Sequence, residues 1–157
     1  MPPRTPTNRL VVTQSTKPAE VRMALEALTV PETVGVPAGM VYDFARTMEN
    51  LPLWASGLAA GVIQENGEWF AESPMGRVKV EMALRNDFGV LDHDVTLPSG
   101  VKVHNAFRVT PAGDHSVLTF VVLRMPDVSA EDFSRDLDHV ARDLKMLKTL
   151  LERGRAA

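Results

Sequence analysis

The feature that most constrains the fold is a change of hydrophobic period late in the chain. Between about residues 60 and 125, apolar and polar residues alternate with a period of two, as expected for antiparallel strands with one buried face. From residue 126 the period becomes helical, and six apolar residues follow one stripe: Phe133, Leu137, Val140, Leu144, Leu147 and Leu151. The pattern predicts a strand meander or partial barrel followed by one long helix. With fewer than about four heptads and a sheet beside it, packing on that sheet is favoured over a coiled coil.

The clearest strand covers residues 77–85, where Val78, Val80, Met82 and Leu84 alternate with charged residues and define a buried face. Turn-forming residues separate this strand from its neighbours. They occur at residues 66–67 (NG), 74–76 (PMG), 98–100 (PSG) and 111–114 (PAGD).

Shorter elements precede the sheet. Residues 17–28 have a locally helical pattern, whereas residues 29–36 have an extended, β-branched pattern. Pro31 argues against a regular central strand at this point. Residues 37–48 predict a short amphipathic helix, and residues 49–57 predict a second short helix or turn.

The first 22 residues form a basic extension rich in Thr and Pro. This extension lacks the apolar core of a signal peptide, and we expect it to be poorly ordered. A single domain is predicted over residues 23–157. Met23 is an alternative start of the protein, because the globular pattern begins near it.

Composition excludes several classes of function. A formal net charge of −3 and a pI near 5.8 give no electrostatic basis for binding nucleic acid or an anionic membrane. The absence of cysteine excludes disulfides, thiolate nucleophiles and Cys-ligated metal centres. No apolar run reaches the ~18 residues of a membrane span. Dinucleotide, P-loop and HExxH motifs are missing from the sequence, so we expect no cofactor. The lack of cysteine is compatible with an intracellular reducing compartment, and we expect a cytoplasmic location.

Residues 91–109 (LDHDVTLPSGVKVHNAFRV) predict a hairpin whose loop length sets its register. A two-residue loop would place apolar and charged residues opposite each other. A three-residue loop at residues 98–100 instead ends on a glycine suited to left-handed backbone. In that register Val95 lies opposite Val103 on an apolar inner face, and a slip of one residue would reverse every side chain.

The same register separates the two histidines of the hairpin. His104 and Asp94 face each other on the outer side, as a surface pair worth at most about 1 kcal/mol. His93 and Asn105 face each other on the inner side. Buried polar groups need partners, so this pair either forms hydrogen bonds inside the core or orients a ligand in a cavity. Because Asp92, His93 and Asp94 alternate between faces, no metal site is expected.

The order of these elements resembles the SRPBCC superfamily, which includes START, Bet v 1 and polyketide cyclase/dehydrase-like proteins. The likeness covers about residues 25–154. It is carried by VPAGMVYDFARTMENLPLWASG (36–57), GEWFAESPMGRVKV (67–80), GVLDHDVTLPSG (89–100) and the C-terminal helix. The resemblance implies an α+β helix-grip fold, in which a curved antiparallel sheet wraps around a long C-terminal helix and two short helices follow the first strand. It also implies a cavity for apolar molecules between sheet and helix, without a catalytic motif to assign.

We therefore expect this cavity to bind a small apolar ligand that is lipid-, polyketide- or aromatic-like. The expected ligand-binding residues are Trp54, Trp69, Met82, His93, Asn105 and Phe107. Trp54 either caps the mouth of the cavity or plugs the core. Two alternatives stay open: a cyclase- or dehydratase-like enzyme with His93 as general acid–base, and a protein-interaction module with a vestigial cavity.

Two further expectations concern surfaces. The strand predicted over residues 116–124 is apolar on both faces. If Leu118, Phe120 and Val122 face outward, they form a strip suited to a homodimer contact. His139, close to acidic neighbours on the long helix, is expected on its solvated side.

Overall fold

The computed structural model describes residues 26–156. Their elements follow in the order β1 (Glu26–Val34), α1 (Ala38–Arg46), η1 (Met48–Asn50), α2 (Leu51–Trp54), η2 (Ser56–Leu58), β2 (Val62–Glu65), β3 (Glu68–Ser73), β4 (Gly76–Met82), β5 (His93–Thr96), β6 (Lys102–Ala112), β7 (His115–Arg124) and α3 (Ala130–Ala156), where η denotes a short 3-10 helix. The predicted extension over residues 1–22, the alternative start at Met23 and the helical pattern before residue 26 lie outside the described residues.

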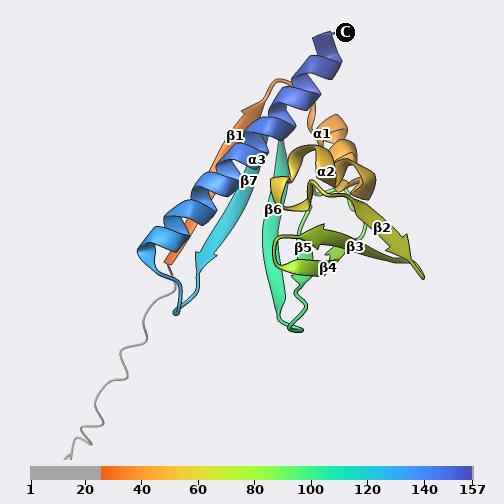
Figure 1. Ribbon diagram of the computed structural model, residues 1–157. Coiled ribbons are helices and arrows are strands. Elements are labelled where there is room, and N and C mark those ends of the chain that lie inside the picture. The colour runs from red at the N-terminus through yellow and green to blue at the C-terminus, as the bar shows by residue number, and fades with distance from the viewer. Residues whose placement is uncertain (1–25, 157) are drawn as a thin grey trace, which may run out of the picture.

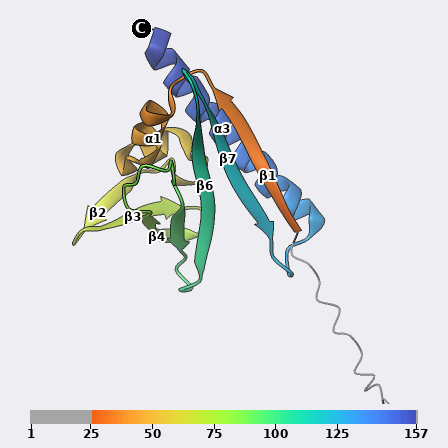
Figure 2. The same ribbon diagram turned by 180° about the vertical axis from the view of Figure 1, so that it is seen from behind.

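The seven strands form one antiparallel sheet in the order β1-β7-β6-β5-β4-β3-β2. The sheet curves around α3, which runs along one side of it, while α1 and α2 lie between β1 and β2 in the chain and beside α3 in space (Figures 1 and 2). This arrangement confirms the predicted α+β helix-grip fold, including the short helices after the first strand.

The edge strand β1 corrects one prediction and explains another. The helical pattern predicted through residue 28 is wrong from Glu26 onward, because these residues pair with β7, beginning with Glu26 opposite Arg124. Pairing with a neighbouring strand outweighs a weak local helix propensity. Pro31 is tolerated in β1 because an edge strand has a neighbour on one side only.

The long helix α3 follows its predicted pattern. It begins after Ser129, whose side-chain oxygen accepts a hydrogen bond from the Asp132 amide at 3.0 Å, as an N-cap does. Its apolar stripe packs against the sheet, with Phe133, Leu144 and Leu147 buried. Through this stripe α3 contacts mainly β1 and β7 of the sheet and α2 beside it.

The sheet is closed at one end and open at the other. Strands β6 and β7 pair from Ala112 opposite His115 to Ala106 opposite Val121. Beyond that point residues 102–105 of β6 pair only with β5, and residues 122–124 of β7 pair only with β1. The two strands therefore diverge toward the lower part of the molecule (Figures 1 and 2).

Three predictions are wrong at the ends of strands. Leu84 was expected on a buried face but is 89% exposed, because β4 ends at Met82. Val103 has its expected partner, Val95, but lies on the surface because the hairpin tip extends beyond the core. The turn predicted at residues 111–114 is confined to residues 113–114, with strand pairing up to Ala112.

Strand β7 settles which of its faces is buried. Leu118 and Val122 are buried and Phe120 is half-buried, so this strip faces the core rather than a partner. A homodimer contact through these residues is therefore ruled out by their burial. Dimerisation through another surface stays a prediction.

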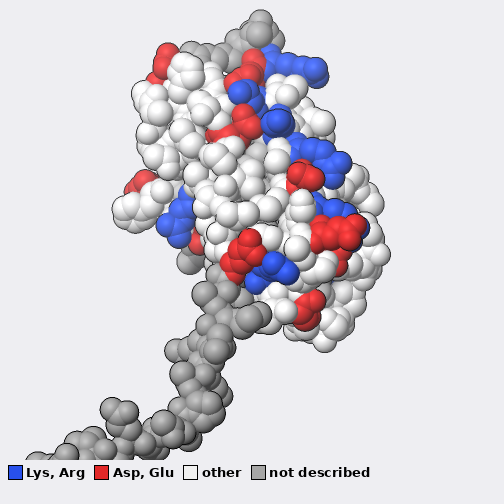
Figure 3. Space-filling model, turned by 90° about the vertical axis from the view of Figure 1, so that its left-hand side faces the viewer, with Lys and Arg blue, Asp and Glu red and all other residues white. Residues whose placement is uncertain are grey.

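The surface carries charges of both signs. On the face shown in Figure 3, acidic and basic side chains are interspersed without an extended patch of one sign. Within residues 26–156, no helix has the length and apolar character needed to cross a membrane.

Candidate functional site

The hairpin formed by β5 and β6 has the predicted register. His93 lies opposite Asn105, Asp94 opposite His104 and Val95 opposite Val103. The three-residue loop closes with a hydrogen bond from the Gly100 amide to the Leu97 carbonyl, and Gly100 adopts φ +87°. Glycine has no Cβ to oppose this left-handed conformation.

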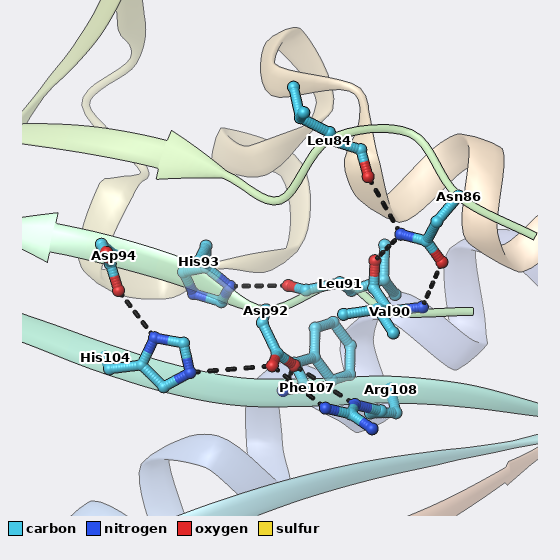
Figure 4. A network of polar contacts seen from close by, with 10 residues as sticks. All are labelled: Leu84, Asn86, Val90, Leu91, Asp92, His93, Asp94, His104, Phe107 and Arg108. Atoms are coloured by element: carbon cyan, nitrogen blue, oxygen red, sulfur yellow. Dashed lines mark hydrogen bonds and ion pairs between the residues drawn. The ribbon is translucent and has the colours of Figure 1, made fainter. Parts of the chain in front are cut away.

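The outer face of the hairpin holds an electrostatic network (Figure 4). The His104 Nδ1 lies 2.7 Å from an Asp94 carboxylate oxygen, and this hydrogen bond lowers the pKa of Asp94. Asp92 accepts hydrogen bonds from the Phe107 amide at 2.9 Å and from Arg108 at 3.2 Å. Burial opposes these bonds, but their net effect lowers the pKa of Asp92. Within the described part of the chain, no group of three or more His, Asp or Glu side chains is arranged to hold a metal ion.

The inner face of the hairpin opens onto a cavity of about 190 Å³. The cavity lies between α2, α3 and the part of the sheet where β6 and β7 diverge. Most of its lining is apolar or aromatic, with a few polar groups. The lining residues are Leu51, Trp54, Ala55, Leu58, Val80, His93, Val95, Asn105, Phe120, His139, Val140, Asp143 and Leu144.

His93 is held in one tautomer at the cavity wall. Its Nδ1 lies 3.0 Å from the Leu91 carbonyl oxygen, which can only accept a hydrogen bond, so Nδ1 carries the proton (Figure 4). Burial lowers the pKa of His93. The ring is therefore neutral at pH 7, and its Nε2 is a hydrogen-bond acceptor without a partner among the described residues. The Phe120 ring meets it edge-on at 6.3 Å between centroids.

Two further cavity residues have unused hydrogen-bonding groups. Trp54 is only 6% exposed, and its Nε1 is buried without a hydrogen-bond partner in residues 26–156. The side-chain amide of Asn105 likewise forms no hydrogen bond within that range, and it does not bond to His93. His93 therefore bonds to the nearby Leu91 backbone, as the core interpretation expects, but His93 and Asn105 do not bond to each other. An unpaired buried polar group costs about 1–3 kcal/mol, a penalty that applies here to the fully buried Trp54 Nε1.

A polar cluster that the sequence analysis missed stands at the edge of the cavity. The Ser56 hydroxyl donates a hydrogen bond to Asp143 Oδ1 at 2.7 Å and lies 3.2 Å from His139 Nε2. His139 is exposed, as expected, but it also lines the cavity. Ser56 and Asp143 both approach Nε2, so the proton relay of a catalytic triad is not formed. The cluster instead ties η2 to α3. The spacing of His139 and Asp143, four residues apart on a helix, was its only signal in the sequence.

The structure divides the six expected ligand-binding residues. Trp54, His93 and Asn105 line the cavity. Phe107 is 1% exposed and packs against Trp54 and Phe120, at 5.9 and 5.5 Å between ring centroids, so it supports the cavity from behind.

The other two expected residues lie elsewhere. Trp69 and Met82 are half-buried and line a separate surface hollow with Arg46 and Lys79. They project inward by alternation, as predicted, but toward η1 rather than toward the cavity. The strand pattern defines a face and does not define which part of that face borders the opening.

Comparisons with known proteins show the fold. No family model matches the chain, and no curated protein matches its sequence. Solved structures do match. A START superfamily protein from Mycobacterium smegmatis superposes with a TM-score of 0.57 at 16% identity, over 81% of this chain and 97% of that one.

Two other solved structures have the same fold. Ara h 8.0201, which is Bet v 1-like, gives a TM-score of 0.58 at 13% identity over 82% of this chain and 99% of its own. DynU16, from the dynemicin biosynthetic locus, gives 0.62 at 13% identity, over 82% of this chain and 48% of its own. The chain therefore has the helix-grip fold of the SRPBCC superfamily, to which START and Bet v 1-like proteins belong.

Proposed function

We propose that this protein binds a small apolar ligand in the cavity between the sheet, α2 and α3. The observation that carries the proposal is an apolar cavity lined by two polar groups, the His93 Nε2 and the Asn105 amide, that have no hydrogen-bond partner within residues 26–156. Ligand sites have this composition, with a mainly hydrophobic lining and a few polar groups that fix orientation. The helix-grip fold supports the same location.

The volume of the cavity restricts the ligand. At about 190 Å³ it is smaller than the ~300–1,000 Å³ of drug-sized pockets. It is larger than a 150 Å³ engineered cavity that accommodates benzene. A molecule with one ring fits this space. A long lipid chain or a polycyclic polyketide would require the cavity to open further.

A second candidate function is catalysis on the bound molecule. One observation favours it: His93 is neutral, and its unpaired Nε2 lines the cavity, where it can accept a proton as a general base. The NMR spectrum of a ligand recovered after incubation would change if this were so, whether or not its mass changes. The change should be lost in the His93→Gln variant, whereas binding alone returns the ligand with its spectrum unaltered.

Fluorine NMR with fluorobenzene tests the proposed binding. The 19F signal should broaden and shift saturably with wild-type protein. Val140→Phe fills the cavity from α3 and should abolish this effect. Met146→Phe adds the same ring at a half-exposed α3 position outside the cavity lining and serves as the control. The proposal would be contradicted if fluorobenzene bound equally to wild type and Val140→Phe. It would also be contradicted if fluorobenzene bound neither wild type nor Met146→Phe.

A further inference from the structure

We infer that the cavity selects a neutral, single-ring molecule that carries a hydroxyl group, that is, a phenol-like compound. The inference rests on the proposed binding function and adds the chemical class of the ligand. It follows from three properties of the lining: the hydrogen-bonding groups left without partners, the absence of cationic side chains, and the cavity's size and aromatic character.

The unpaired polar groups of the cavity lining offer both an acceptor and a donor. The His93 Nε2 is an acceptor in the tautomer fixed by Leu91, so a ligand beside it must offer a donor. The Asn105 amide carries an N–H donor as well as a carbonyl acceptor, so it can pair with an acceptor on the ligand. A hydroxyl group both donates and accepts, whereas an ether or a ketone can only accept.

The charges around the cavity favour a neutral ligand. Among the described residues, no Lys or Arg lines the cavity and Asp143 is the one carboxylate in the lining. Asp143 already accepts hydrogen bonds from the Ser56 hydroxyl and amide. An anionic ligand would lose its hydration without gaining a counter-charge, and an ammonium group would compete with Ser56 for Asp143. A phenol, with a pKa near 10, enters as a neutral molecule at pH 7.

The shape of the lining favours an aromatic ring. Trp54 and Phe120 border the cavity, and Phe107 fixes both of them from behind. Aromatic rings pack against one another in tilted and edge-to-face arrangements, as His93 and Phe120 do here. One ring with a hydroxyl group fills the available ~190 Å³ and keeps its polar end within reach of the wall.

A matched set of fluorinated probes tests this inference by 19F NMR. The probes are 4-fluorophenol, 4-fluorotoluene, 4-fluorobenzoate and 4-fluorobenzylamine, which share a ring and differ in one substituent. We expect 4-fluorophenol to bind about three- to tenfold more tightly than 4-fluorotoluene, as one net hydrogen bond predicts. The benzoate and the benzylammonium should bind more weakly than 4-fluorotoluene.

Variants identify the groups responsible. Asn105→Leu removes the side-chain amide and keeps a side chain of similar size, so it should reduce the preference for 4-fluorophenol over 4-fluorotoluene at least twofold. Trp69→Phe, outside the cavity, should leave the preference unchanged. If fluorobenzene binds in the cavity but the phenol is no better than the toluene, the hydroxyl inference is overturned and the binding function stands. If fluorobenzene does not bind, the binding function fails, and this inference fails with it.

Discussion

The closed and open ends of the sheet handle buried polar groups differently. At the closed end, where β6 pairs with β7, the buried Ser116 hydroxyl donates to the Val36 carbonyl at 2.9 Å, and the Gly35 amide donates to Glu152 at 2.9 Å. At the open end, the Trp54 indole and the Asn105 amide form no hydrogen bond within the described chain. The comparison indicates that packing at the closed end maintains the fold, which allows the open end to keep groups unpaired for a ligand.

The largest expected difference between the two ends is in their response to loss of packing. Leu147 is fully buried at the closed end, so the substitution Leu147→Ala should lower the free energy of unfolding by about 2–5 kcal/mol. Leu58 is half-buried beside the cavity, so Leu58→Ala should cost about 1 kcal/mol. Urea denaturation measures both. Equal costs would show that the open end is packed as tightly as the closed end.

Acid should destabilise the open end through His93. Its pKa is lowered in the folded protein, so the unfolded chain binds more protons as pH falls below the ordinary value of 6.5. Stability is therefore full above pH 6.5 and is lost as pH falls toward the folded pKa, by at most about 1.4 kcal/mol per pH unit.

The His93→Gln variant isolates this contribution, since glutamine does not titrate. The free energy of unfolding of this variant, followed by urea denaturation from pH 7.5 to 5, should decline less steeply than that of wild type. His104→Gln is the matched control on the outer face of the same hairpin. Parallel curves for wild type and His93→Gln would rule out the buried neutral histidine.

The tie between η2 and α3 should contribute a moderate amount. Ser56→Ala removes the hydroxyl bond to Asp143 and should cost about 1 kcal/mol of unfolding free energy, with faster amide hydrogen exchange over residues 56–61. Thr149→Ala, which removes a hydroxyl bond within α3, is the control and should leave that exchange unchanged. Unaltered exchange in Ser56→Ala would show that the cluster does not hold the edge of the cavity.

The smallest effect is expected on the outer face of the hairpin. Asp94→Asn weakens the exposed pair with His104 and should change the unfolding free energy by about 0–1 kcal/mol. Added salt should reduce this difference further, because exposed charges are screened. A loss above 2 kcal/mol that persists in 1 M NaCl would show that this pair contributes more to stability than an exposed ion pair does.

The sequence was most informative where two local signals agreed. The register of the β5–β6 hairpin followed from an apolar period of two together with a loop that ends on Gly100. Burial along the same strands was less predictable. Val103 has the right partner and is still exposed, because burial depends on what covers the hairpin tip.

The site itself was only partly predictable for the same reason. His93 and Asn105 could be found because polar residues on an apolar face contradict the pattern around them. The cluster of Ser56 with His139 joins residues 83 positions apart, so no local sequence pattern predicts this contact. Trp69 and Met82 face inward but lie away from the divergence of β6 and β7, a feature that only the paired sheet defines.

The two tryptophans allow the most direct test of the central claim. This claim is that the open end of the sheet holds a ligand-binding cavity. In 15N-labelled protein titrated with 4-fluorophenol, the indole N–H signal of Trp54 should shift saturably because its ring borders the cavity. The indole signal of Trp69, outside the cavity, should stay in place. Equal shifts of both signals, or a shift of Trp69 alone, would contradict the account.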